Sequence, residues 1–145
     1  MWVELALSVY PEVELFERAR SEDIDRIERI VGAPLPADLR GLLLETDGML
    51  GEYSLDVVWN ARRIADDNAS FRANASFADL YQPFDDLLFF GDNGGGDQFA
   101  FMPHDPQAGV IVWQHENDNR RKVAEDLSDY LRKILSSEGD EWYDE

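Results

Sequence analysis

The segment from Gly91 to Asp97 is glycine-rich and contains residue types that could bind a ligand. A phosphate-binding loop needs a lysine, or the start of a helix, directly after its glycines, whereas here Asp97 and a predicted strand follow. Calcium is a second candidate, but the spacing of Asp92, Asn93 and Asp97 does not fit an EF-hand loop and no bidentate glutamate follows. We therefore interpret the glycines as a wide turn with positive φ angles, and we predict no nucleotide, metal or other cofactor.

The histidines show no recognisable catalytic or metal-binding pattern. His115-Glu116 is half of a zincin motif, but Asn119 stands where the second histidine would be needed. The chain has no Gly-x-Ser-x-Gly elbow for a serine nucleophile, and it has no cysteine for a thiol nucleophile or a zinc site. We interpret the adjacent pairs of acidic residues as solvated surface. The residues therefore give no positive sign of catalysis, and we predict that the protein is not an enzyme.

The charge of the chain restricts its partners. The sequence has 31 acidic residues and 13 Lys and Arg, which gives a net charge of −18 at pH 7. Nucleic acids and anionic membranes are disfavoured as partners, because clustered Lys and Arg provide most of the affinity for phosphates. The negative charge can serve solubility alone, or it can steer a basic partner. No signal segment or membrane-spanning run is recognisable, so we expect a cytoplasmic protein.

The first half of the chain predicts mainly helices. A short amphipathic stretch covers residues 13–19. A second helix begins at Ser21, which we predict as its N-cap, and ends at Gly32. A third begins near Pro36 and stops at Asp47-Gly48. Residues 61–82 are expected to form a short helix and a loop.

The second half predicts strands. Residues 55–59 form one strand, and residues 87–90, 98–101 and 110–113 form an antiparallel meander whose Phe99 and Phe101 share one face. A last helix is predicted from Arg121, because the apolar residues from Val123 to Ile134 are spaced for one helix face. The length fits one α+β domain, 1–145, in which Trp59 and Trp113 belong to the core.

The acidic tail, about residues 138–145, contains two aromatic residues. Trp142 and Tyr143 are flanked by acidic residues, so we expect them to be exposed. Exposed aromatic side chains often anchor protein interfaces, and we therefore predict these two as partner contacts.

The order of these features resembles the SUKH superfamily, which includes the fungal Smi/Knr cell-wall-synthesis regulator and many bacterial immunity proteins. The resemblance is carried by motifs along most of the chain. They are Ile24-x-x-Ile27-Glu28, Gly32-x-x-Leu35-Pro36-x-Asp38-Leu39, Leu43 to Gly48, Trp59, Phe90 to Phe101, Val112-Trp113-x-His115-Glu116 and Val123-Ala124-x-x-Leu127-x-x-Tyr130-Leu131.

The resemblance implies an α+β domain with a central, mostly antiparallel sheet flanked by helices, and a role without catalysis. It implies that the chain is an immunity protein that binds and neutralises a cognate toxin, often a nuclease, and we expect this toxin to have a basic surface. A regulatory or scaffold module of the Smi/Knr type and a hydrolase that uses its carboxylates are the alternatives. The motif residues are structural or partner-binding by this resemblance, and they are Trp59, Gly94, Gly95, Gly96, Asp97, Trp113, His115 and Glu116.

Overall fold

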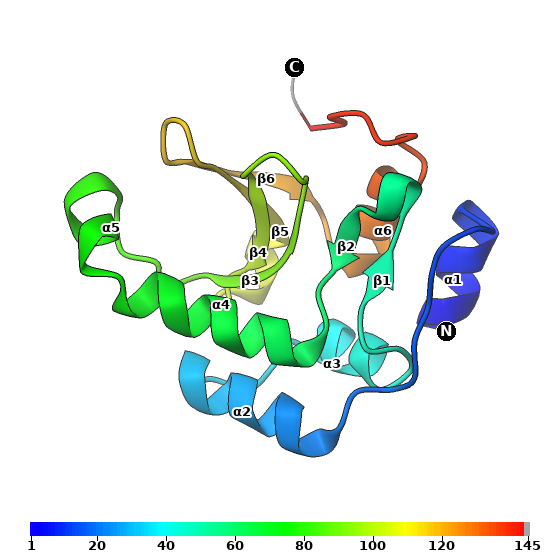
Figure 1. The fold of residues 1–145 in the computed structure, drawn as a ribbon, viewed down its shortest axis with the longest axis horizontal. Coiled ribbons are helices and arrows are strands. Elements are labelled where there is room, and N and C mark those ends of the chain that lie inside the picture. The colour runs from blue at the N-terminus through cyan, green and yellow to red at the C-terminus, as the bar shows by residue number, and fades with distance from the viewer. Residues whose placement is uncertain (144–145) are drawn as a thin grey trace.

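A computed structural model describes residues 1–143 as a single domain of mixed α+β architecture (Figure 1). Strands β3, β4, β5 and β6 form an antiparallel sheet in that order, and β1 and β2 form a separate antiparallel pair. The elements in chain order are α1 (Trp2–Val9), α2 (Ser21–Val31), α3 (Ala37–Leu43), β1 (Met49–Leu50), β2 (Asp56–Val58), α4 (Ala61–Ala73), α5 (Ala75–Leu80), β3 (Leu88–Asp92), β4 (Gln98–Phe101), β5 (Val110–Gln114), β6 (Asn119–Ala124) and α6 (Leu127–Leu135), with single 3-10 turns at Glu52–Ser54 and Pro106–Ala108.

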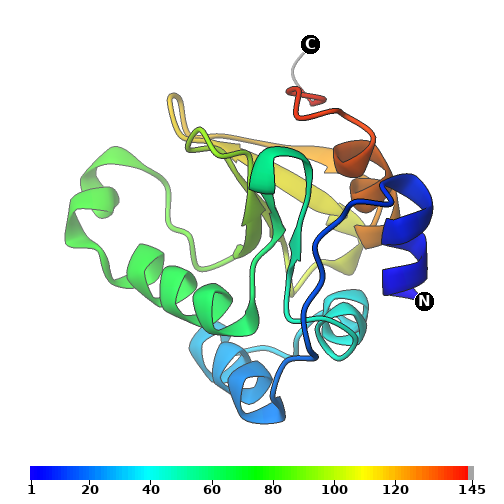
Figure 2. The ribbon, with the colours of Figure 1, turned by 45° about the vertical axis from the view of Figure 1, so that its right-hand side comes forward.

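The main sheet has an aromatic layer on each face, because successive side chains of a strand point to opposite sides. On one face Phe99 of β4 lies 5.1 Å, between ring centroids, from Tyr130 of α6. On the other face Trp113 of β5 lies 5.6 Å from Phe71 of α4. The sheet is therefore packed between α6 and the α4–α5 pair, as Figures 1 and 2 show. Phe101 stacks on Phe90 and Phe90 contacts Tyr130, so the predicted common face of Phe99 and Phe101 is confirmed.

The outer edge of β3 is closed by a buried side chain of α4. The Asn68 amide donates to the Phe89 carbonyl at 2.8 Å and accepts from the Phe89 amide at 2.9 Å, as a neighbouring strand would. The backbone amide of Trp59 donates to the next carbonyl, that of Phe90, at 2.7 Å. At the opposite edge of the sheet, Lys133 of α6 donates to the Val123 carbonyl of β6 at 3.0 Å. Both edges of the sheet are thus contacted by groups from outside it.

Near the N-terminus the predicted helix over residues 13–19 is wrong. The helix, α1, lies earlier, and the segment that follows it is extended, with Glu14 and Leu50 exchanging backbone hydrogen bonds of 2.8 and 3.1 Å. This pairing uses the backbone groups that a helix would need. The predicted N-cap of α2 is also displaced by one residue, because Arg20 holds that position and Ser21 is the first helical residue. Gly32 ends α2 with a φ of 75°, as expected.

Two later predictions also need correction. Residues 61–80 form two helices rather than one short one, with Asn60 capping α4 through the Arg63 amide at 2.8 Å. The helix predicted from Arg121 begins only at Leu127, because residues 119–124 pair with β5 as β6. Asp126 accepts from the Asp129 amide at 2.8 Å and so caps α6 after this strand. No helix among the described residues is both long and apolar enough to cross a membrane.

Candidate functional site at the glycine-rich turn

The glycine-rich turn joins β3 to β4 and is organised by Asn93. The Asn93 side-chain oxygen accepts from the amides of Gly95 at 2.8 Å and Asp97 at 3.1 Å. Gly94 and Gly96 have φ angles of 81° and 111°, a region that favours glycine. The prediction of positive φ angles is therefore confirmed at these two positions. It is wrong at Gly95, which does not adopt a positive φ.

Asp97 and His115 form a close pair beside this turn. Asp97 is buried, and its Oδ1 lies 2.8 Å from the ring Nδ1 of His115 and accepts from the His115 amide at 3.2 Å. A Cβ at position 96 would lie 2.7 Å from Cε1 of this ring. Glycine at 96 is therefore needed both for the backbone conformation and for space, and three of the motif residues share one structural unit.

Tyr143 completes this unit from the C-terminal tail. Its hydroxyl donates to Asp97 Oδ2 at 2.9 Å and accepts from the side-chain Nδ2 of Asn93 at 2.6 Å. The backbone carbonyl of Tyr143 accepts from the Arg121 guanidinium. Burial and the Asp97 carboxylate raise the pKa of Tyr143 well above its usual value, so the phenol remains a donor. The expected exposure of Tyr143 is therefore wrong, because 5% of its surface is accessible.

Trp142 is also less exposed than expected. It is half-buried, and its ring stacks on Phe99 with a centroid distance of 5.6 Å. The tail therefore packs on the α6 face of the sheet instead of projecting from it. The role of Trp142 and Tyr143 as partner contacts stays a prediction. The last two acidic residues of the tail, 144 and 145, lie outside the described residues.

Three of the motif residues lie outside this hydrogen-bonded unit. Trp59 is fully buried, with the guanidinium of Arg63 at 4.2 Å from its ring, and Trp113 is buried on the α4–α5 face, so their assignment to the core is confirmed. Glu116 is exposed in the turn after β5. The structure thus brings together Gly96, Asp97 and His115, but not the two tryptophans.

Asp118 is a structural centre that the sequence analysis missed. Its carboxylate accepts from the Trp113 indole and the Gln82 amide, both at 2.8 Å, and from Arg120 at 3.0 Å. Partial burial alone would raise the pKa of Asp118, but these hydrogen bonds and the Arg120 charge lower it overall. Asp118 therefore fastens the β5–β6 turn to the segment before β3. No local pattern reveals this, since its partners are separated by up to 36 residues.

A polar pocket of about 330 Å³ lies beside the Asp97–His115 pair, and Glu116 and Glu141 contribute to its wall. Such a pair can hold a histidine as a general base, but the residues that line this pocket include no hydroxyl or thiol nucleophile. The described residues also contain no group of three or more His, Cys, Asp or Glu that could hold a metal ion. The hydrogen bonds of the pair instead support a structural role for the turn.

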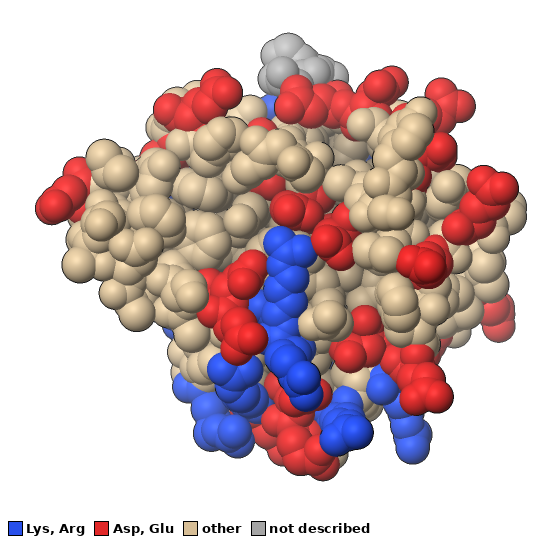
Figure 3. All heavy atoms as spheres, in the orientation of Figure 1, with Lys and Arg blue, Asp and Glu red and all other residues tan. Residues whose placement is uncertain are grey.

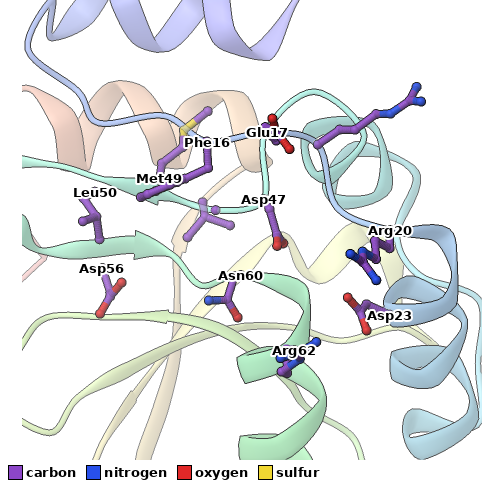
Figure 4. A pocket seen from close by; sticks show the side chains of 13 residues that line it. Phe16, Glu17, Arg20, Asp23, Asp47, Met49, Leu50, Asp56, Asn60 and Arg62 are labelled. Atoms are coloured by element: carbon purple, nitrogen blue, oxygen red, sulfur yellow. The ribbon is translucent and has the colours of Figure 1, made fainter.

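A wider hollow of about 560 Å³ lies on the face shown in Figure 3, between the segment before α2, the β1–β2 pair and the start of α4. It mixes both signs of charge, and Figure 4 shows Arg20 beside Asp23 at its rim. Asp47 and Asn60 in this hollow accept from the amides of Ala61 and Arg63, both at 2.8 Å. These two polar side chains therefore cap the first turn of α4. Because the lining carries both basic and acidic residues, the hollow does not favour a ligand of one charge.

The comparison with known proteins identifies the family of this α+β domain. The model of the SMI1 / KNR4 family (SUKH-1) matches residues 18–133, which include α2 to β6 and most of α6. The chain therefore belongs to this family, and the resemblance seen in the sequence is confirmed. The family covers toxin-immunity proteins and Smi/Knr-like regulators, which bind partners and are not known as enzymes. A search of curated proteins finds no match. Helix α1 and the tail with Tyr143 lie outside the family match.

Proposed function

We propose that this protein is a cytoplasmic immunity protein that binds and neutralises a cognate protein toxin with a basic surface. Membership of a family that includes toxin-immunity proteins supports this proposal. The observation that carries it is the charge of the surface. A net charge of −18 is suited to covering the cationic cleft with which a nuclease holds its substrate.

The negative charge is available to a partner because much of it is not neutralised within the fold. Glu22, Asp25 and Asp79 are examples from three places on α2 and α5, and each is exposed and without an ion pair among the described residues. Figure 3 shows acidic side chains along the upper and right-hand margins of one face, while lower on this face the basic side chains lie among further acidic ones. A basic protein would therefore be attracted from a distance before any specific contact forms.

Neutralisation of a toxin by binding needs no catalytic step from the immunity protein. A bound acidic domain blocks the toxin by occupying its substrate site, and electrostatic attraction raises the association rate. Fast association matters because the toxin must be captured before it acts.

The proposal is tested by co-expression with the toxin domain encoded in a neighbouring reading frame. We expect a one-to-one complex on gel filtration, loss of toxin activity and restored growth of the host. An unrelated acidic protein of equal charge is the control for non-specific attraction. A stable complex in which the toxin stays active would contradict the proposal and favour the scaffold or regulatory alternative. Absence of any complex would exclude that toxin as the cognate partner.

A further inference from the structure

A groove of about 340 Å³ lies at the end of β4 opposite the glycine-rich turn. It is bounded by the start of α3, the connection from β4 to β5, and the junction of β6 with α6. Met102 and Pro103 are half-buried and supply most of its accessible apolar surface, with Phe101 and the fully buried Leu127 beneath them. The groove therefore offers apolar contact to a side chain that enters from solvent.

The rim of this groove is acidic. Asp38, Asp105, Glu125 and Asp126 are all exposed there, and none of the residues that line the groove is Lys or Arg. Glu125 pairs with Lys122 at 2.9 Å, and Asp126 caps α6, so these two are partly neutralised. The carboxylates of Asp38 and Asp105 make no hydrogen bond or ion pair within the described residues.

Two helices begin at this groove, and helix N-termini disfavour a cation. Each has its own acidic residue, Asp38 in the first turn of α3 and Asp126 at the cap of α6. Loss of water raises the pKa of Asp38, and repulsion by the nearby Asp126 carboxylate raises it further. With Asp105 added, the rim keeps an excess of negative charge that folding does not balance.

We propose that this groove is the docking site for one Lys or Arg side chain of the basic protein partner. The alkyl stem packs on Met102, Pro103 and the accessible edge of Phe101, and the cationic head lies among the rim carboxylates. Lys and Arg combine these two properties in one side chain. An anionic group would be repelled, and a neutral apolar group would cover carboxylates without pairing them, which is costly. The identity of the partner as a toxin rests on the function proposed above.

The groove can be probed without the partner by titrating ¹⁵N-labelled protein with n-butylguanidinium chloride. We expect saturable shifts of the Met102, Asp105 and Leu127 amides, with a dissociation constant on the order of 1–10 mM, as a ligand this small allows. Two control compounds each have only one of the two recognised features: 1-pentanol has an alkyl stem without the charge, and guanidinium chloride has the charge without a stem. We expect both to bind at least about tenfold more weakly.

A matched pair of variants then separates the groove from general charge. The groove variant is D38N/D105N/D126N, in which Asn at 126 preserves a good N-cap. The control variant is E4Q/D25N/D79N, which removes the same charge from exposed positions on three other helices. We expect the affinity for n-butylguanidinium to fall at least about tenfold in the groove variant and less than about twofold in the control variant. Equal losses, or shifts spread over the whole acidic surface, would overturn the proposal.

The same two variants distinguish this inference from the proposed function. If the wild-type protein does not bind the toxin of the neighbouring reading frame, that toxin is excluded as the cognate partner, and the titration alone decides whether the groove recognises an alkyl cation. If the toxin binds both variants with equal affinity, the immunity role stands and the groove is not the docking site. Weaker toxin binding by the groove variant alone supports both.

Discussion

Single residues of the glycine-rich turn differ in what they contribute, although the sequence shows three identical glycines. Gly94 and Gly96 have positive φ angles and Gly95 does not. Of the two, only Gly96 also faces a neighbour that a side chain would displace, the His115 ring. Sequence reasoning predicts the turn, but it treats the glycines as equivalent. The φ of each residue depends on the Asn93 hydrogen bonds and on the contact of Asp97 with His115, which lies 18 residues later in the chain.

This difference predicts unequal effects on stability for two neighbouring substitutions. G96A places a Cβ in a strained conformation and against His115, and we expect it to lower the free energy of unfolding by about 1–3 kcal/mol. G95A is the matched control, since its Cβ would meet only Asn93 at 3.6 Å or more, and we expect a change within about 0.5 kcal/mol. Urea unfolding measures both. Equal losses would show that the positive φ at Gly96 has no special importance.

Asp118 gives a prediction about pH. Its folded-state pKa is lowered, so its ionised form stabilises the fold above the ordinary pKa of about 3.9, and this contribution is lost as the pH falls through the lower folded value. D118N keeps the shape but loses the charge. We expect it to cost about 1–3 kcal/mol at pH 7.

The gap between wild type and D118N should then close as the pH falls below about 4, because the wild-type carboxylate becomes protonated too. Chemical unfolding across a series from pH 7 to pH 3 measures this gap. A gap that stays constant with pH would mean that shape, rather than charge, makes Asp118 effective.

The sequence predicts a helix or strand well where one of its faces is buried and where capping or terminating residues mark its ends. Helix α2 buries Ile24, Ile27 and Val31 and ends at Gly32, so its pattern is local and complete. Strand β6 is different, because Ala124 is the one residue in it that is fully buried, and no period-two pattern results. The spacing of Val123 and Leu127 then imitates a helix. The exposure of the tail is predicted wrongly for a related reason, because Tyr143 is held by a hydrogen bond to Asp97, which lies 46 residues earlier in the chain.

The junction of α4 with β3 depends on one buried amide, which predicts a large effect from a single change. N68L keeps the approximate size of the side chain but leaves the Phe89 amide and carbonyl without their partner. Each buried unsatisfied backbone group costs about 1–3 kcal/mol, so we expect a loss of about 2–5 kcal/mol in the free energy of unfolding.

The S70L variant is the control for N68L, because it changes an exposed position of the same helix and should alter stability by about 0.5 kcal/mol or less. Hydrogen exchange of the Phe89 amide provides a second measurement, which should become at least about tenfold faster in N68L. An unchanged exchange rate would contradict the assignment of Asn68 as the cover of the β3 edge.

The molecule as a whole carries a charge whose reach depends on salt. Between 0.01 M and 0.15 M ionic strength the screening length falls from about 30 Å to about 8 Å. If the net charge of −18 steers the toxin, the association rate should fall steeply over this range, while dissociation changes little because apolar anchors determine residence time. Stopped-flow binding measures both rates. An association rate that does not depend on salt would leave solubility as the role of the charge.

The covered edges of the main sheet affect how concentrated the protein can become before it aggregates. An open strand edge is a template on which a second chain can add, and repeated addition leads to ordered aggregates. Here Asn68 occupies the β3 edge and Lys133 contacts β6, whose run Arg120-Arg121-Lys122 would meet its own like charges if two such edges paired antiparallel. Strand-to-strand growth is therefore disfavoured at both ends of the sheet. The immunity role proposed above requires the protein to be present in excess before the toxin arrives, and covered sheet edges permit such a high concentration.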